Sequence, residues 1–234
     1  ASVVVPPPPL PATVGRLASG VAHELGTPLN VIQGHARLIE TGDVDDLSDS
    51  AATITRQTQR MASIIRQLLD FSRPRPAVKA TTDLVRLARE TMTMLVASAQ
   101  ASGTDLKVES PDGPVSAAID ESQVLQVLTN LTLNAIQASP RGTEVRLRVT
   151  RPDPAHARVE VIDAGHGMSE HVKDHLFEPF FTTKQVGNGT GLGLAVSYGI
   201  VQDHGGTIEA SSVLGQGTTF SVLLPTGEAT WQVA

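Results

Sequence analysis

The sequence lacks several residue types that many functional sites require. Its 234 residues include no cysteine, one tryptophan, one tyrosine and five phenylalanines. Without cysteine, the chain cannot form a disulfide framework, a thiolate zinc site or a cysteine nucleophile. Few aromatic side chains argue against surfaces that stack nucleic acid bases, and the formal net charge of −6 argues against binding to duplex DNA. Histidine, carboxylates, amides and glycine backbone remain for chemistry.

Long hydrophobic runs are also lacking. The longest nearly uninterrupted apolar stretch, at about 191–201, is well short of the roughly 18 residues that a membrane-spanning helix needs. No signal-peptide pattern is visible at the start. The composition, with 40% hydrophobic and 18% charged residues, is that of a globular chain, and its length predicts one or two domains.

Two amphipathic segments with helical spacing follow a proline-rich start. Residues 1–11 include four consecutive prolines, which forbid a helix, so we interpret this segment as a linker. Over about 12–40 the apolar positions recur at alternating spacings of four and three, which is typical of a coiled-coil seam. The seam residues are Val14, Ala18, Val21, Leu25, Pro28, Ile32, His35 and Ile39. A second helix is predicted over about 48–71, with a seam of Ala51, Ile54, Met61, Ile65 and Leu68.

The two helices form a hairpin that cannot cover both seams by itself. A second copy of the chain would complete a four-helix bundle, and packing on the following domain is the alternative. Pro74 and Pro76 end the second helix, which places a domain boundary near residues 73–77.

His23 lies outside the seam of the first helix. At 100° per residue it falls at about 200° from the seam, on the solvent face, and Thr27 follows one turn later. Pro28 removes the helical hydrogen bond to the carbonyl of Glu24, and Gly26 weakens the helix further. Such a distortion beside an exposed histidine indicates a functional site. A surface histidine beside a tolerated kink is the alternative, and threonine at position 27 excludes a His-Glu-x-x-His zinc motif.

Beyond residue 78 the pattern alternates between helices and short strands. We expect helices over about 83–101, 121–138 and 191–203. We expect strands over about 104–109, 115–119, 143–150, 157–163, 206–212 and 217–224. Several strands form hairpin-like pairs, so the predicted α+β arrangement is a mixed or antiparallel sheet with helices on one face.

A glycine-rich segment, GNGTGLG at 187–193, precedes the last predicted helix. Alternating glycines permit positive φ and close approach to a ligand, and the N–H groups at the helix start suit a polyphosphate. The segment fits neither a P-loop nor a Rossmann fingerprint. A flexible surface loop is the alternative.

Three polar side chains stand at positions that suit nucleotide binding. Asp163 ends an apolar strand, where its carboxylate can accept a hydrogen bond from an exocyclic amine such as that of adenine; a turn aspartate is the alternative. Asn130 and Asn134 lie one turn apart on a predicted helix, and amide oxygens are suitable ligands for Mg²⁺. Amides that cap neighbouring backbone are the alternative.

Six segments, in this order along the chain, resemble the motifs of sensor histidine kinases. HELGTPLN at 23–30 resembles the H box, and LTNLTLNAIQAS at 128–139 resembles the N box. DAGHGM at 163–168, GTGLGLA at 189–195 and GQGTTF at 215–220 resemble the three glycine boxes, and FEPFFTTK at 177–184 resembles the F box. The N box and glycine boxes look closest to those of the nitrogen-regulator type of kinase.

The resemblance implies a fold and a domain order. A dimerising helical hairpin for histidine phosphotransfer, a four-helix bundle in the dimer, would occupy 12–73. An α/β sandwich ATP-binding domain of the gyrase, chaperone and histidine kinase type would occupy 77–226, before a tail at 227–234. The chain would lie in the cytoplasm, as the whole or as the cytoplasmic part of a larger sensor.

The resemblance also implies roles for residues and ligands. His23 would be the phosphoacceptor and Glu24 the acid or base that assists it, with ATP and Mg²⁺ as cofactors. Asn134 would bind the metal, and Phe180 would anchor a lid over about 177–190. The remaining nucleotide-site residues would be Asn130, Asp163, Gly165, Gly167, Gly189, Gly191, Gly193 and Thr218. Lys184 either reaches a phosphate or is solvated.

A response regulator receiver domain would take the phosphoryl group from His23 onto an aspartate. Thr27 would position water for dephosphorylation of that regulator. One alternative is a nucleotide-binding scaffold or phosphatase-biased module with negligible kinase activity. Another is a gyrase-like or chaperone-like ATPase, which leaves the His23 helix unexplained. His171 and His175, four residues apart, are interpreted as a solvated pair, with metal binding as the alternative.

Overall fold

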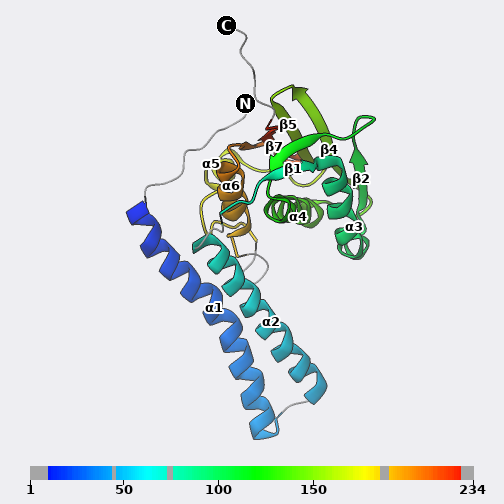
Figure 1. The fold of residues 1–234 in the computed structure, drawn as a ribbon. Helices are drawn as coiled ribbons and strands as arrows, with labels where there is room; N and C mark the ends of the chain where they lie inside the picture. Colours follow the sequence, from blue (N-terminus) through cyan, green and yellow to red (C-terminus); the bar gives the residue numbers. More distant parts are fainter. Residues whose placement is uncertain (1–9, 44–45, 73–75, 185–189, 228–234) are drawn as a thin grey trace. The chain divides into compact units, whose positions relative to one another are not determined.

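Two long helices form an antiparallel hairpin at the start of the described chain. The computed structural model describes residues 10–43, 46–72, 76–184 and 190–227. Helix α1 spans Leu10–Thr41 and α2 spans Leu47–Ser72, and they pack along their length (Figure 1). Near the connecting turn, Nδ1 of His35 lies 3.1 Å from Oγ of the buried Ser50. Of the linker expected at 1–11, residues 1–9 lie outside the described residues, and Leu10 and Pro11 belong to α1 instead, where proline is tolerated in the first turn. Of the tail expected at 227–234, residues 228–234 lie outside the described residues.

The seam between the helices differs in part from the predicted one. Pro28 is buried and Leu25 and Ile32 are half-buried, as their spacing predicts, whereas the side chains of Val14 and Ala18 lie outside the description. On α2, Ile64 is buried, whereas Ala51 and Ile65 of the predicted seam are exposed, so neither belongs to the seam between these two helices. The buried and half-buried positions continue the alternating spacing as Ile54, Gln57, Met61, Ile64 and Leu68.

The remaining chain folds around a five-stranded sheet in the order β2-β4-β5-β7-β6. The strands are β2 (Asp105–Glu109), β4 (Glu144–Asp153), β5 (His156–Asp163), β6 (Thr207–Val213) and β7 (Gly217–Pro225). Only β2 and β4 are parallel, and the other pairs are antiparallel, so the predicted mixed sheet is confirmed. Strand β1 (Ala80–Asp83), which the sequence pattern does not predict, pairs with β3 (Ser116–Ile119) in a separate two-stranded sheet.

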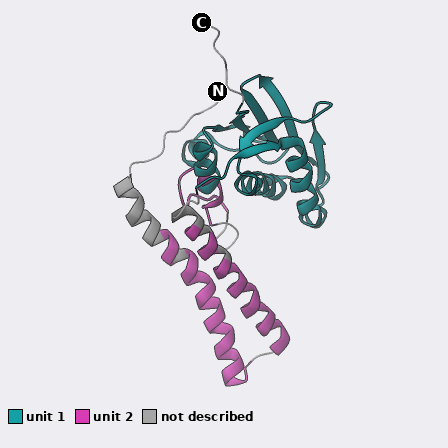
Figure 2. Cartoon of the chain, viewed as in Figure 1, with its two compact units in different colours: residues 1–5, 75–176, 196–234 teal, residues 6–74, 177–195 magenta. Residues whose placement is uncertain are grey.

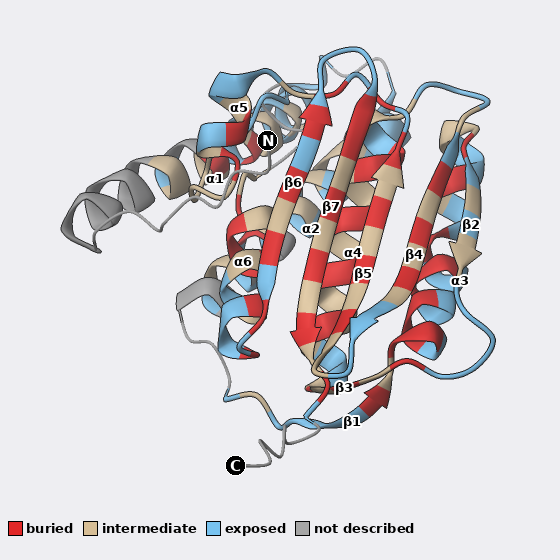
Figure 3. Ribbon diagram, turned by 90° about the horizontal axis from the view of Figure 1, so that it is seen from above, coloured by how far each residue is buried: buried red, intermediate tan, exposed pale blue. Residues whose placement is uncertain are grey.

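Helices α3 (Leu84–Ser102) and α4 (Glu121–Ala138) pack on one face of the large sheet (Figure 3). Buried and half-buried residues alternate along β5, so every second side chain points into the core, as with Val159 and Val161. The half-buried positions carry charges that pair across strands. Arg148 lies 3.0 Å from Glu109 and 3.7 Å from Glu160.

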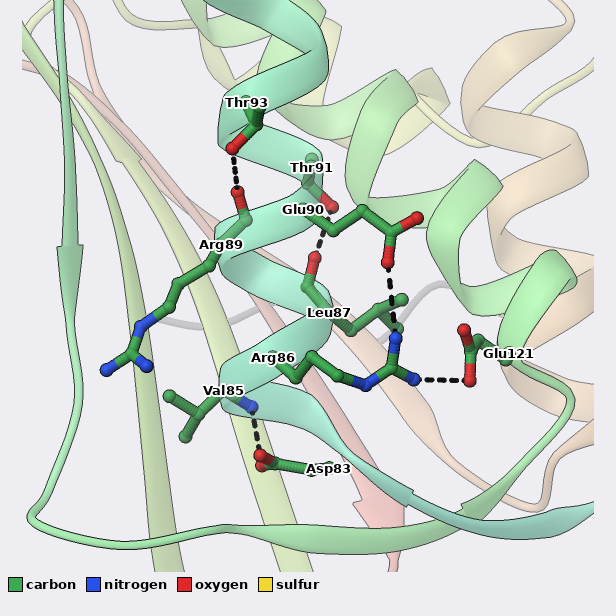
Figure 4. Close-up of polar contacts among 9 residues, drawn as sticks. All are labelled: Asp83, Val85, Arg86, Leu87, Arg89, Glu90, Thr91, Thr93 and Glu121. Carbon is green, nitrogen blue, oxygen red and sulfur yellow. Dashed lines mark hydrogen bonds and ion pairs between the residues drawn. The ribbon is translucent and has the colours of Figure 1, made fainter.

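Both helices begin at aspartate caps. The Asp83 carboxylate accepts a hydrogen bond from the backbone N–H of Val85, and Arg86 pairs with Glu90 and Glu121 (Figure 4). Asp120 caps α4 by accepting from the N–H of Gln123, and a hydrogen bond from the Ser122 hydroxyl helps lower the pKa of its carboxyl. The predicted bounds of α4 are confirmed because this cap and the apolar spacing are both local signals.

Two shorter helices, α5 (Glu170–His175) and α6 (Gly193–Asp203), complete the fold. The chain divides into two compact units, one of residues 1–5, 75–176 and 196–234 and one of residues 6–74 and 177–195 (Figure 2). No helix in the described ranges has both the length and the hydropathy needed to cross a bilayer.

Candidate functional site

Asp163 lies at the end of β5, and its carboxylate is held by two backbone groups. Oδ1 accepts hydrogen bonds from the N–H of Gly165 at 2.8 Å and from the N–H of Thr218 at 3.1 Å. The residue is 7% exposed, and this burial raises the pKa of the carboxyl against the opposing effect of the two N–H groups. Oδ2 makes no hydrogen bond within the described part of the chain, and it is not sealed from solvent.

Gly165 and Gly167 fit this corner because they have no side chain. A Cβ on Gly165 would meet the carbonyl oxygen of Ala138 at 2.6 Å, so any larger residue would force β5 and α4 apart. Gly167 has a φ of 65°, and a Cβ there would meet the Val213 carbonyl oxygen at 2.1 Å. Gly165 thus lies against Asp163, whereas Gly167 lies against the end of β6.

Ser212 links the residues around Thr218, and sequence analysis missed it. Its hydroxyl lies 2.8 Å from the backbone nitrogen of Met168, 2.9 Å from the carbonyl oxygen of Gly217 and 3.0 Å from Oγ1 of Thr218. Both hydroxyl side chains are buried. The alternation along β6 could have identified Ser212, because it places this polar residue on the inward face of the strand with Ile208 and Ala210.

Asn130 and Asn134 lie one turn apart on α4, and both are half-buried. The Nδ2 of Asn130 lies 3.5 Å from Oγ of Ser197, a fully buried residue of α6. The spacing places both amides on the same side of the helix. Their oxygens are hard donors of the kind that Mg²⁺ prefers, so the chemistry of this pair fits that ion.

The segment before α6 contains a tight backbone contact between Phe180 and Gly191. The N–H of Phe180 donates to the Gly191 carbonyl at 3.0 Å, and a Cβ on Gly191 would meet the Phe180 carbonyl carbon at 2.4 Å. Phe180 has a φ of 65°, the only positive φ of a non-glycine residue in the described ranges. Gly193 begins α6 and Lys184 is exposed, whereas Gly189 lies outside the described residues.

The predicted phosphoacceptor residues lie on α1. The helix continues through Pro28, and the side chain of His23 lies outside the description. Glu24 is 8% exposed, and its Oε2 lies 3.4 Å from the guanidinium of Arg60 on α2. Thr27, one turn after His23, is half-buried. Arg60 was missed, because no local spacing predicts which residue of the second helix meets Glu24.

His171 and His175 lie one turn apart on α5. The ring centroids of His171 and His175 are 4.6 Å apart. No group of three or more histidine, cysteine or acidic side chains in the described part of the chain is arranged to hold a metal ion.

Comparison with known families agrees with this architecture. Residues 13–77 match the His Kinase A (phospho-acceptor) domain, and residues 119–228 match the histidine kinase-, DNA gyrase B- and HSP90-like ATPase family. The fold and the site therefore define an ATPase domain of this type that follows a phosphoacceptor hairpin. Together the two domains make up the catalytic core of a sensor histidine kinase.

Individual relatives support the same conclusion. Sporulation kinase E from Bacillus subtilis (strain 168) is 33% identical over 212 residues, covering 91% of this chain. This chain spans 28% of the length of that relative. Among solved structures, histidine kinase ThkA in complex with the response regulator protein TrrA is 26% identical with a TM-score of 0.77, over 92% of this chain and 62% of that one. Full-length ShkA in complex with AMPPNP is 27% identical with a TM-score of 0.69, over 90% of this chain and 45% of that one.

Proposed function

We propose that the chain uses ATP to phosphorylate His23 and then transfers the phosphoryl group to an aspartate of a response regulator receiver domain. The arrangement of Asp163 carries this proposal. One carboxylate oxygen is fixed by two backbone N–H groups, and the other is available for the exocyclic amine of adenine. The pKa of this buried carboxyl is raised, and only one of its two oxygens accepts hydrogen bonds from the described residues. Such a group is costly for folding, which indicates that a ligand uses it.

We assign the remaining predicted residues to the other parts of the ATP molecule. We place the adenine against Asp163, Gly165, Gly167 and Thr218. Asn130 lies in the same site, and Asn134 would hold Mg²⁺, which neutralises charge on the transferring phosphate. Backbone at Gly189, Gly191 and Gly193 would bind the phosphates at the start of α6, with Phe180 as the anchor of the lid and Lys184 as a candidate phosphate ligand.

In the transfer step, a ring nitrogen of neutral His23 attacks the γ-phosphorus of ATP. A nitrogen–phosphorus bond forms, the bond from phosphorus to the β,γ-bridging oxygen breaks, and ADP leaves. Glu24 accepts the proton that the imidazole loses. Its burial beside Arg60 supports a fixed position for this carboxylate. The receiver aspartate then takes the phosphoryl group from the phosphohistidine.

The hairpin is proposed to dimerise into a four-helix bundle. Ile65 and Leu69 lie one turn apart on α2 and are exposed, which supports a second apolar stripe beside the intramolecular seam. The complex formed by the ThkA neighbour supports a response regulator as the other partner. Thr27 is proposed to position water for dephosphorylation of that partner. The motif style supports the nitrogen-regulator subtype, and the need for ATP supports a cytoplasmic location.

Incubation with γ-labelled ATP and Mg²⁺ tests the proposal. The native protein should acquire acid-labile, base-stable label that His23→Gln abolishes. His35→Gln is the matched control, because His35 lies on the same helix and contacts Ser50 rather than the phosphoacceptor region. It should retain the label. Label that persists in His23→Gln would contradict the site, and nucleotide binding without label would favour a nucleotide-binding scaffold.

A further inference from the structure

The hydroxyl protons around Ser212 can be assigned from their neighbours. A serine hydroxyl donates one hydrogen bond and can accept two. The Gly217 carbonyl can only accept, so at 2.9 Å it takes the Ser212 proton. The Met168 N–H can only donate, so at 2.8 Å it fills one lone pair of Ser212. The contact between Ser212 and Thr218 at 3.0 Å must then use the Thr218 proton.

This assignment fixes the polarity of Thr218. With its proton committed to Ser212, Oγ1 of Thr218 presents lone pairs only. Asp163 faces Thr218 directly across the β5–β7 pair, and Oδ2 of its carboxylate is also an acceptor. The Asp163–Thr218 corner therefore presents two acceptors and no hydroxyl donor.

We propose that Ser212 is a positioning residue that makes this corner selective for adenine. The inference rests on the proposed function and deepens it. Adenine carries a donor amine at position 6, whereas guanine and hypoxanthine carry an acceptor oxygen there. Two fixed acceptors pair with the amine and repel the oxygen. A Thr218 hydroxyl without the Ser212 contact could rotate and donate to that oxygen, which would remove part of the discrimination.

Buried hydroxyl networks support such selectivity because reorganisation is costly. Ser212 and Thr218 are each 8% exposed, so neither hydroxyl can exchange its partner for bulk water at low cost. Ser212 is also held through its backbone, since the Nζ of buried Lys173 lies 3.5 Å from its carbonyl oxygen. The acceptor state of Thr218 is therefore built into the fold before a nucleotide arrives.

The test compares the dissociation constants of ADP and IDP, which differ at position 6 of the base, by calorimetry with Mg²⁺ on the whole chain. The native protein should prefer ADP, and Ser212→Ala should lower the preference ratio about tenfold. Ser212→Thr, which keeps the hydroxyl, should restore the native ratio. Ser211→Ala is the matched control, because Ser211 is the adjacent exposed residue of the same strand, and it should leave the ratio unchanged.

The outcomes separate this inference from the proposed function. A folded Ser212→Ala with the native ratio would overturn the role of Ser212 alone, whereas a native protein that binds neither nucleotide would overturn both. If Ser212→Ala does not fold, Thr218→Val decides. Loss of an acceptor should lower the ADP preference, and an unchanged or higher preference would show that Thr218 acts as a donor.

Discussion

The α/β domain and the helical hairpin bury their apolar side chains to very different extents. In the domain, helix and sheet residues such as Leu128, Leu131, Leu147 and Val161 are completely buried. Among the described side chains of the hairpin helices, Pro28 and Ile64 are the only apolar ones that are buried. The hairpin exposes Leu29, Leu38, Leu47, Ile65 and Leu69, and the larger α/β domain also exposes some apolar side chains, such as Met94 and Val213.

This difference separates a self-sufficient module from an incomplete one. A domain that closes its own core can present a rigid ligand site, because the strands and helices that hold Asp163 do not depend on a partner. A two-helix hairpin buries one seam only, so its stability depends on association. The comparison predicts that substitutions in the domain will change nucleotide affinity or unfolding stability, whereas substitutions in the hairpin will change association.

The largest effect is expected from Asp163→Asn. The amide cannot offer a second acceptor at the Oδ2 position, so the affinity for ADP should fall about a hundredfold or more, as measured by calorimetry. Asp153→Asn, at an exposed carboxylate of the same domain that pairs with His156, should leave ADP affinity unchanged.

The same variant should separate function from stability. Burial raises the pKa of Asp163 in the folded state, so ionisation of this group favours the unfolded chain as pH rises through the folded pKa. At pH 7, Asp163→Asn should therefore unfold at a temperature no lower than the native protein. Its advantage should shrink on acidification, as the native carboxyl takes up its proton. A variant that is markedly less stable at pH 7 would contradict this account.

A smaller effect, confined to the α/β domain, is expected from His204→Leu. His204 is 1% exposed, its Nδ1 donates to the Ile200 carbonyl at 2.7 Å, and its Nε2 accepts from the N–H of Asp120 at 2.9 Å. Leucine would leave the Asp120 N–H unpaired at the start of α4. The free energy of unfolding should fall by about 2 kcal/mol in denaturant titrations. His156 is half-exposed, so His156→Gln should lower the free energy of unfolding far less. Equal losses in the two variants would contradict a special role for the buried His204.

The smallest effect is expected from Ile65→Asp on the hairpin. If Ile65 belongs to the dimer stripe, a charge there should raise the dimer dissociation constant at least tenfold, as measured by sedimentation. Met94→Asp on α3 places the same charge at an exposed apolar residue of the other region, and it should leave association unchanged. Monomeric native protein, or equal effects of both substitutions, would contradict the proposed bundle.

The sequence predicts the fold where the signals are local. The α4 helix agrees with its predicted bounds, since Asp120 caps its start and the apolar spacing is regular. Strand β1 was missed because its four residues pair only with β3, more than thirty residues later. Ile65 was misassigned because two adjacent stripes of α2 are apolar, and spacing alone does not say which stripe meets α1.

The candidate site shows the same limit. Asp163, Gly165 and Gly167 belong to one short motif, and the structure holds Gly165 against the Asp163 carboxylate at the end of β5 and Gly167 against Val213. Ser212 and Arg60 act through partners that are distant in sequence, Met168 and Glu24 respectively. Such pairs depend on strand register and helix packing, which no short pattern specifies.

Separating the two regions tests the central claim most directly. A hairpin fragment of residues 1–76 would be mixed with a fragment of residues 77–234, Mg²⁺ and γ-labelled ATP. We predict acid-labile label on the hairpin fragment, and none when that fragment carries His23→Gln. Label on the 77–234 fragment, or on a hairpin without His23, would contradict the assignment of nucleotide binding to one region and phosphate acceptance to the other.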